Sequence, residues 1–188
     1  MPDPTENRRR NLGFFFDAAV ARLPDKVAII DLFGGRERSS TYLQLDARMD
    51  QVARMLARLG VRPGERIAML VGNRTEFVEF FFGAMRMGAI PLPLNIRLAG
   101  DTLAAIIADA ACVLALVDPS SNRDALAVAQ RVPLRQRLLL DQQHDGFLAF
   151  EAEMVKPADQ VAPPQSRTTP RPFSPTRPAR PGAPRARS

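Results

Sequence analysis

A βαβ pattern in the middle of the chain limits the possible folds more than any other feature of the sequence. It runs without interruption from Gly60 to Leu98, as GVRPGERIAMLVGNRTEFVEFFFGAMRMGAIPLPLNIRL. Gly60 predicts the end of a preceding helix, because glycine readily takes the left-handed conformation that closes a helix. The short apolar run from Arg66 to Val71 predicts a buried strand soon after it.

The second half of this segment predicts a helix followed by a strand at the edge of a sheet. Asn73 predicts the helix cap, and Glu76 stands three residues later at the capping-box spacing. Gly88 predicts the end of that helix. Pro91 and Pro93 lack a backbone donor, so the strand that contains them is expected at a sheet edge.

This order of residues resembles the N-terminal region of the AMP-forming acyl-CoA synthetases, members of the adenylate-forming superfamily. The resemblance covers roughly residues 11 to 155 and includes Tyr42 to Leu45 and the N-x-R-L at Asn95 to Leu98. In that family a similar run reads Gly-Val-x-x-Gly-Asp-Arg-Val-Ala, an Asn, a helix and Gly-Ala-x-x-x-Pro-Leu-Asn, and this chain has Glu65 where Asp is commoner. The resemblance implies a partial N-terminal domain, because 188 residues are too few for the family's whole enzyme.

Before the central segment, the sequence predicts a hairpin and then a long helix. Val27 to Asp31 and Ser39 to Tyr42 read as short strands that pair across a glycine turn. Thr41 begins the helix, with Gln44 as its capping-box partner. An apolar stripe is expected in the core, at Leu45, Met49, Val52, Leu56 and Leu59. The solvated sides are expected to carry arginines balanced by nearby aspartates, namely Arg48, Arg54 and Arg58 with Asp46 and Asp50.

After the central segment, helices and strands continue to alternate. The expected elements are a helix capped by Asp101, a strand from Cys112 to Val117, a helix from Asp124 to Gln130 and a strand from Arg137 to Leu140. Strands that alternate with such helices are joined by right-handed crossovers. The expected fold class is therefore α/β, with βαβ units forming a largely parallel sheet and helices on both of its faces.

The net charge of +6 is concentrated at the end of the chain. Residues 157–188 carry six arginines against Asp159 alone, so they account for five of the six net positive charges. We therefore divide the chain into a domain at 1–156 and a Pro/Arg-rich tail at 157–188, whose composition predicts disorder. The domain is close to neutral, so its charge does not indicate a nucleic-acid partner.

The sequence offers little for metal, thiol or membrane chemistry. Cys112 lies in an apolar run and is expected to be buried, whereas His144 lies in a polar stretch and is expected in a solvated loop. No apolar run reaches the ~18 residues that cross a bilayer. Phe14 to Val20 reads as a first amphipathic helix, and nearby acidic residues argue against a secretory signal, with a transit peptide as the alternative. We expect a cytoplasmic protein without a metal site.

An adenylate-forming enzyme must hold the phosphates of ATP, which requires a glycine-rich loop and a lysine or arginine. This chain contains no G-x-x-x-x-G-K, no G-x-G-x-x-G and no Thr/Ser/Gly-rich loop ending in Pro-Lys. The resemblance implies ATP, Mg²⁺ and CoA for the parent family, but we expect none of them to bind this chain and assign no catalytic residue. The resemblance implies a binding role for Arg97 alone, as the residue that contacts a phosphate of CoA. The alternative is that Asn95 and Arg97 tie a loop to a strand end.

The tail suggests a hypothesis about the gene. From Thr168 onward it consists of Thr, Pro, Arg, Phe, Ser, Ala and Gly, a composition that a GC-rich gene yields when it is read out of frame. Synonymous codons exist for Pro175 to Ala186 that, read from their third base, encode Y-T-S-G-S-T-G-R-P-K-G. That peptide resembles the phosphate-binding loop of the family. We hypothesise that a frameshift near residues 164–168 removed this loop and truncated the enzyme.

Three functions are consistent with these observations. The first is a truncated AMP-dependent acyl-CoA ligase, inactive alone, whose parent would activate a carboxylic acid with ATP to an acyl-adenylate and pass it to CoA. The alternative is an Arg/Pro-rich arm that binds nucleic acid or proline-reading proteins. The third is one part of a split enzyme. Because neighbouring strands would be missing from the sheet, we also expect low solubility.

Overall fold

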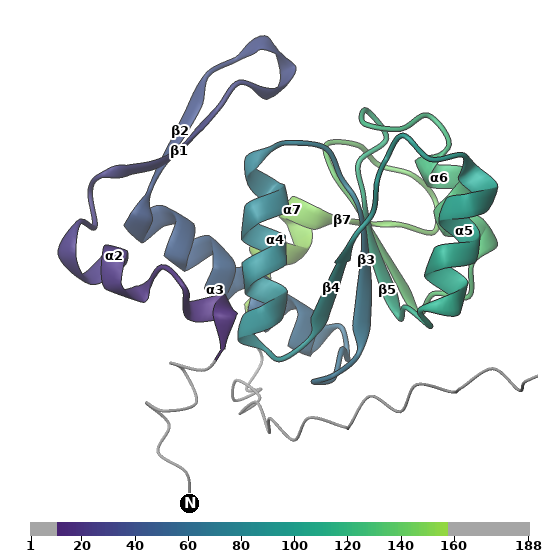
Figure 1. The fold of residues 1–188 in the computed structure, drawn as a ribbon, viewed down its shortest axis with the longest axis horizontal. Coiled ribbons are helices and arrows are strands. Elements are labelled where there is room, and N and C mark those ends of the chain that lie inside the picture. The colour runs from purple at the N-terminus through teal and green to yellow at the C-terminus, as the bar shows by residue number, and fades with distance from the viewer. Residues whose placement is uncertain (1–10, 158–188) are drawn as a thin grey trace, which may run out of the picture.

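The computed structural model describes residues 11–157, which form a layered body with an N-terminal extension (Figure 1). All but the first residue of the predicted tail lies outside the described residues. The extension begins with a 3-10 turn, η1 (Leu12–Phe14), and continues into α2 (Asp17–Arg22). The single helix predicted from Phe14 to Val20 is therefore wrong in its bounds. Asn11 closes the first turn by accepting a hydrogen bond from the Gly13 N–H, so the turn is a separate element.

The predicted hairpin is confirmed. Its strands are β1 (Val27–Asp31) and β2 (Arg38–Thr41), which pair antiparallel and form a two-stranded sheet of their own. The connection contains η2 (Phe33–Gly35), where Gly34 and Gly35 have φ of 70° and 73°. These values lie in the left-handed region that favours glycine. Figure 1 shows the hairpin extending away from the larger sheet.

A long helix, α3 (Tyr42–Arg58), follows the hairpin directly. The predicted capping box is confirmed, because Thr41 Oγ1 accepts from the Gln44 N–H at 3.2 Å and Gln44 Oε1 accepts from the Thr41 N–H at 2.9 Å. The apolar stripe is buried at Leu45, Met49, Val52, Met55 and Leu56. Gly60 follows the helix with φ of 79°, as the sequence predicts.

Five parallel strands form the main sheet in the order β4-β3-β5-β6-β7. The strands are β3 (Arg66–Leu70), β4 (Ile90–Pro93), β5 (Leu114–Val117), β6 (Gln136–Leu139) and β7 (Leu148–Ala149). The strand with two prolines, β4, lies at an edge, as predicted. Three predicted strands match β3, β5 and β6 to within two residues, and β7 was not predicted.

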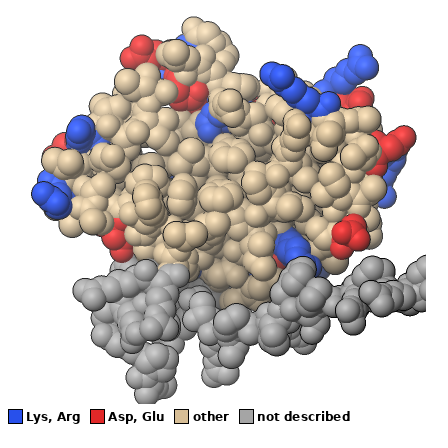
Figure 2. All heavy atoms as spheres, in the orientation of Figure 1, with Lys and Arg blue, Asp and Glu red and all other residues tan. Residues whose placement is uncertain are grey.

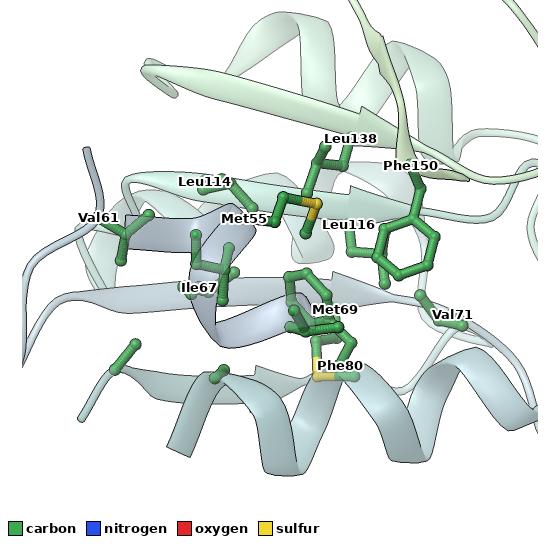
Figure 3. Close-up of a cluster of buried hydrophobic side chains, with 14 of the residues drawn as sticks. Met55, Val61, Ile67, Met69, Val71, Phe80, Leu114, Leu116, Leu138 and Phe150 are labelled. Atoms are coloured by element: carbon green, nitrogen blue, oxygen red, sulfur yellow. The ribbon is translucent and has the colours of Figure 1, made fainter. Parts of the chain in front are cut away.

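Helices cover both faces of this sheet, so the predicted α/β class is confirmed. The further helices are α4 (Thr75–Arg86), α5 (Gly100–Asp109), α6 (Ala125–Arg131) and α7 (Phe150–Met154). One core cluster joins α3, α4 and α7 to one face, with Met55, Phe80 and Phe150 around Ile67 and Met69 of β3 (Figure 3). The other cluster joins α5 and α6 to the opposite face.

Two predicted helix caps are wrong. The helix α4 begins at Thr75 rather than after Asn73, and the Thr75 N–H donates to Asp31 Oδ2 at 3.0 Å. A carboxylate brought by the hairpin therefore replaces the predicted local cap. The helix α5 begins at Gly100 without a side-chain cap, and Asp101 lies in its first turn, where it pairs with Arg131 at 2.7 Å.

The arginines of α3 are not balanced by the aspartates of the same helix. Arg48 pairs with Glu79 and Glu151 at 2.9 and 2.6 Å, and Arg58 pairs with Glu153 at 2.7 Å. The aspartates Asp46 and Asp50 instead pair with Arg86 of α4. The predicted charge balance within the helix is therefore wrong for Arg48 and Arg58, because α4 and α7 pack against α3 and supply the partners instead.

Candidate functional site

The strand order places a topological switch point between β3 and β5. After β3 the chain crosses through α4 to β4 on one side, and after β5 it crosses through α6 to β6 on the other side. The two helices pack on opposite faces of the sheet. Open α/β sheets bind their ligands outside the carboxyl ends of the strands at such a point. We therefore take the candidate site to be the carboxyl-edge loops, defined as residues 71–74, 94–99, 118–124 and 140–147.

Hydrogen bonds join three of the carboxyl-edge loops. The Gly72 N–H donates to Ser121 Oγ at 2.9 Å, and Ser121 in turn donates to Asp118 Oδ2. Asn122 Nδ2 donates to the Ile96 carbonyl oxygen at 2.6 Å. A Cβ at Gly72 would lie 2.4 Å from Ser121 Oγ, so a side chain there would displace the hydroxyl that makes this contact. The loops after β3, β4 and β5 are thus held against one another.

Arg97 lies on the loop that follows β4 and is exposed. Its backbone N–H donates to Asn95 Oδ1 at 3.0 Å, so the two residues form a local turn. The bond from Asn122 to Ile96 ties this turn to the loop after β5. Arg97 is therefore at the carboxyl edge of the sheet, and its role toward CoA stays a prediction.

Arg74 is the most connected charge at this edge, and its side chain is 2% exposed. Its Nε donates to Glu76 Oε2 at 2.6 Å and its Nη1 donates to Asp141 Oδ2 at 2.5 Å. Asp118 Oδ2 lies 3.6 Å from the same Nη1. On the other side the guanidinium stands over the Phe33 ring of the hairpin, 4.6 Å from its centroid. One buried cation thus contacts the hairpin, the start of α4 and two of the carboxyl-edge loops.

The charges around Arg74 are held in their ionised forms. Burial raises the pKa of Glu76, but hydrogen bonds from Arg74 and Arg38 outweigh it and lower that pKa to about 2. Burial likewise opposes ionisation of Asp31, but bonds from Thr75, Phe33 and Arg38 hold its pKa below the usual range. Burial lowers the pKa of Arg74, yet its bonds to Glu76 and Asp141 keep it above the ordinary value. Asp31, Glu76 and Arg74 are therefore all charged at neutral pH.

The buried polar side chains at this edge are bound to one another. Within residues 11–157, every buried side-chain nitrogen or oxygen has a hydrogen-bond partner. No group of three acidic, histidine or cysteine side chains in that range could hold a metal ion. Cys112 is buried, as predicted, and burial raises the pKa of its thiol. His144 is exposed in a loop, as predicted.

Sequence reasoning missed the network around Arg74. Asp118 could have been found, because it directly follows an apolar strand whose carboxyl end must meet those of its parallel neighbours. Asp141 could have been found in the same way, because it directly follows the strand predicted from Arg137 to Leu140. Arg74 and Asp31 carry no such shared signal, since they are 43 positions apart along the chain. Figure 2 shows acidic and basic side chains interspersed around a largely uncharged face, without a basic patch in that view.

A family model described as AMP-binding enzyme matches residues 16–181 of the chain. The chain belongs to this family. The resemblance noted from the sequence is thereby confirmed. None of the helices in residues 11–157 of this family member has the length and hydrophobicity that crossing a bilayer requires.

Two curated relatives of this AMP-binding family member are CoA ligases by name. A 3-hydroxybenzoate–CoA ligase from an Aromatoleum species is 38% identical over 96 residues, which are 51% of this chain and 18% of that protein. A long-chain-fatty-acid–CoA ligase from Mycobacterium tuberculosis is 39% identical over 69 residues, which are 37% of this chain and 14% of that protein. The matched regions thus span less than a fifth of these relatives.

Solved structures confirm the fold of this AMP-binding chain. A benzoate CoA ligase from Burkholderia xenovorans superimposes with a TM-score of 0.68 over 85% of this chain and 30% of that one, at 22% identity. The layered body therefore has the same fold as part of that larger benzoate CoA ligase.

Proposed function

We propose that the chain is the amino-terminal part of an AMP-forming acyl-CoA ligase. The parent enzyme would join a carboxylic acid to AMP with release of pyrophosphate and then transfer the acyl group to the thiol of CoA. The family match over residues 16–181 is the observation that carries this proposal. The two relatives described above are named for an aromatic acid and for long-chain fatty acids, so we propose a carboxylic acid of one of these two kinds as the substrate.

Within that enzyme, the role of the described residues is to hold the loops at the carboxyl edge of the sheet. Arg74 keeps the loops after β5 and β6 in place through Asp118 and Asp141. The turn that carries Arg97 is fixed to the loop after β5 by Asn122. We propose that Arg97, exposed on this turn, contacts a phosphate of CoA once the rest of the ligase is present.

We further propose that the chain does not adenylate an acid by itself. Charge that builds on the α-phosphate and on the departing pyrophosphate needs backbone N–H groups and a cation aimed at it. The 188 residues contain no glycine-rich loop followed by lysine that could supply them. ATP, Mg²⁺ and CoA are therefore cofactors and substrates of the parent enzyme.

Pyrophosphate release tests this proposal. The purified chain is incubated with ATP, Mg²⁺, CoA and a panel of benzoic, hydroxybenzoic and fatty acids, beside a complete 3-hydroxybenzoate–CoA ligase as positive control. We expect release with the control alone. Turnover by the chain would contradict the proposed inactivity, and turnover only after co-expression with the downstream reading frame would identify a split enzyme.

The proposed frameshift is tested on the gene itself. The tail at 157–188, to which it applies, lies beyond the described residues except for Pro157. Codons at Pro175 to Ala186 that yield the glycine-rich loop when read from their third base would support the proposal. Codons that cannot yield it would end the proposal. The alternative of a nucleic-acid or protein-binding arm rests on the same tail, and the comparisons give it no support.

A further inference from the structure

The β1–β2 hairpin is attached to the body in two different ways. At its base, the backbone N–H groups of Tyr42 and Leu43 donate to the carbonyl oxygens of Lys26 and Pro24 at 3.1 and 3.0 Å. Toward the tip, the attachment is made by side chains. Ala28 and Ile29 of the first strand are half-buried. The other apolar residues of the strand and its end are exposed, with Val27 at 46%, Ile30 at 63% and Leu32 at 69%. Apolar burial therefore contributes little to holding the tip, and neither core cluster includes a residue of the hairpin.

The side-chain attachment is a compact polar contact that we call the hairpin latch, formed by Asp31, Arg38, Thr75 and Glu76. Asp31 Oδ2 accepts from the Thr75 N–H at 3.0 Å, from its hydroxyl at 2.9 Å and from Arg38 Nη2 at 2.6 Å. Arg38 also donates to both oxygens of Glu76, at 2.9 and 3.2 Å. Charge-assisted bonds of this kind are directional, so a displacement of the hairpin breaks them together.

The hairpin latch shares its groups with the carboxyl-edge loops. Glu76 Oε2 accepts from Arg38 Nη2 and also from Arg74 Nε. Arg74 in turn binds Asp141 on the loop after β6, while its other face lies over Phe33 of the hairpin. Asp141 has φ of 59°, a left-handed conformation that an aspartate tolerates but that needs support from its surroundings. Removing the hairpin would take both Phe33 and Arg38 away from the group that holds Asp141.

We propose that the hairpin opens about its base as a unit while the parallel sheet stays folded, and that its closure is coupled to the order of residues 140–147 through Arg74. Opening breaks polar contacts but exposes almost no apolar core, so its free energy is far smaller than that of global unfolding. The coupling follows because Arg74 contacts both the hairpin and Asp141. A closed hairpin stabilises the position of Arg74 that binds Asp141, and Asp141 stabilises the position of Arg74 that contacts the hairpin. The hairpin is thus a movable element whose position changes the order of residues 140–147 at the carboxyl edge of the sheet.

Hydrogen exchange of the full chain at neutral pH tests both parts of this proposal. We expect amides of residues 27–41 to exchange together and at least tenfold faster than those of β3 and β5. Arg38→Ala removes a hairpin side chain that is 46% exposed. This variant should speed exchange of residues 27–41 a further tenfold and of residues 140–147 severalfold. Exchange of β3 and β5 should not change. Glu37→Gln is the matched control on the same exposed strand end and should change neither region.

A second variant approaches the coupling from the other end. Asp141→Asn keeps a residue that tolerates the left-handed conformation but removes the charge that Arg74 binds. We expect it to speed exchange at 27–41 severalfold, whereas Asp145→Asn, an exposed control in the same loop, should not. Hairpin amides that exchange as slowly as those of β3 would contradict the proposal that the hairpin opens as a unit. An Arg38→Ala effect confined to 27–41, together with an Asp141→Asn effect confined to its own loop, would overturn the coupling.

Discussion

Asp31 Oδ2 accepts two hydrogen bonds from Thr75, one from the backbone N–H at 3.0 Å and one from the hydroxyl at 2.9 Å. The two residues are 44 positions apart, so the start of α4 is capped by a side chain from the hairpin. A carboxylate at a helix N-terminus also gains from the helix dipole. The same contact therefore caps the N-terminus of a helix, buries a charge and joins the hairpin to the body.

The Thr75 hydroxyl is expected to stabilise the fold measurably. Thr75→Val keeps the backbone N–H and the shape of the side chain but removes one donor to a buried carboxylate, at a cost of about 1 to 2 kcal/mol in the free energy of unfolding. Thr75→Ser retains the donor and should lose less than half as much. Urea unfolding of the three proteins checks this, and equal stability of Thr75→Val and the parent chain would show that the hydroxyl contributes nothing.

Stability should fall in acid because of the charges at the start of α4. Asp31 and Glu76 have lowered pKa values in the folded chain, so their contribution is present above the unfolded pKa and is lost as the pH falls. For Glu76 the window runs from 4.5 down to about 2, and the shift corresponds to about 3 kcal/mol at most. Glu79 acts in the opposite direction, because burial raises its pKa even though Arg48 partly offsets that effect.

Urea unfolding at pH 7, 4 and 3 measures this dependence. Glu76→Gln should be less stable than the parent chain at pH 7 and should lose less stability between pH 7 and pH 3. Glu37→Gln, on the exposed side of the hairpin, serves as the control and should follow the parent curve. A Glu76→Gln variant with the full pH dependence of the parent would contradict the assigned role of Glu76.

Arg48 should contribute far more to the stability of the fold than its exposed partner Glu151. Glu79 is buried and depends on Arg48 at 2.9 Å, whereas the side chain of Glu151 is 57% exposed. Arg48→Met would leave the Glu79 charge buried without its partner and should cost about 3 kcal/mol or more. Glu151→Gln breaks only a solvated pair and should cost less than about 1 kcal/mol. Chemical denaturation of the two variants checks the contrast, and similar losses from both would contradict it.

Gly83 is expected to be essential for the packing of α4 on α3. A Cβ at this position would lie 2.5 Å from the Val52 Cβ and 2.7 Å from the Met49 carbonyl oxygen. Gly83→Ala should therefore destabilise the chain by about 2 to 3 kcal/mol despite the higher helix propensity of alanine. Gly100→Ala at the start of α5 meets its neighbours at 3.3 Å or more and is the control, with little loss expected. Thermal melts of both variants test this prediction. A Gly83→Ala chain as stable as the control would show that α3 and α4 can move apart to accommodate the added methyl group.

Features of the fold that depend on neighbouring residues could be predicted from the sequence. The capping box at Thr41 and Gln44 and the left-handed glycines at Gly60 and Gly88 were predicted because short-range geometry decides them. The order of strands and helices followed from apolar periodicity. The strand β7 and helix α7 were missed because two and five residues are too short for a period to be recognised.

Features that depend on residues far apart in the chain could not be predicted. Asn73 has the right spacing to Glu76, but Glu76 binds Arg38 and Arg74 instead of closing a capping box. Arg48 was assigned to aspartates on its own helix, yet its partner Glu151 is 103 positions away. For the same reason the candidate site was predicted only as far as Arg97, while the network around Arg74 became visible only with the fold.

The most direct test of the proposed function is whether this chain binds ATP. Its thermal midpoint is measured while ATP and Mg²⁺ are titrated, with a complete 3-hydroxybenzoate–CoA ligase as the control that binds. A ligand that binds the folded state raises the midpoint. We predict a rise for the control and no change for this chain. A saturable rise in the midpoint of this chain would contradict its assignment as the part of the ligase without the phosphate-binding loop.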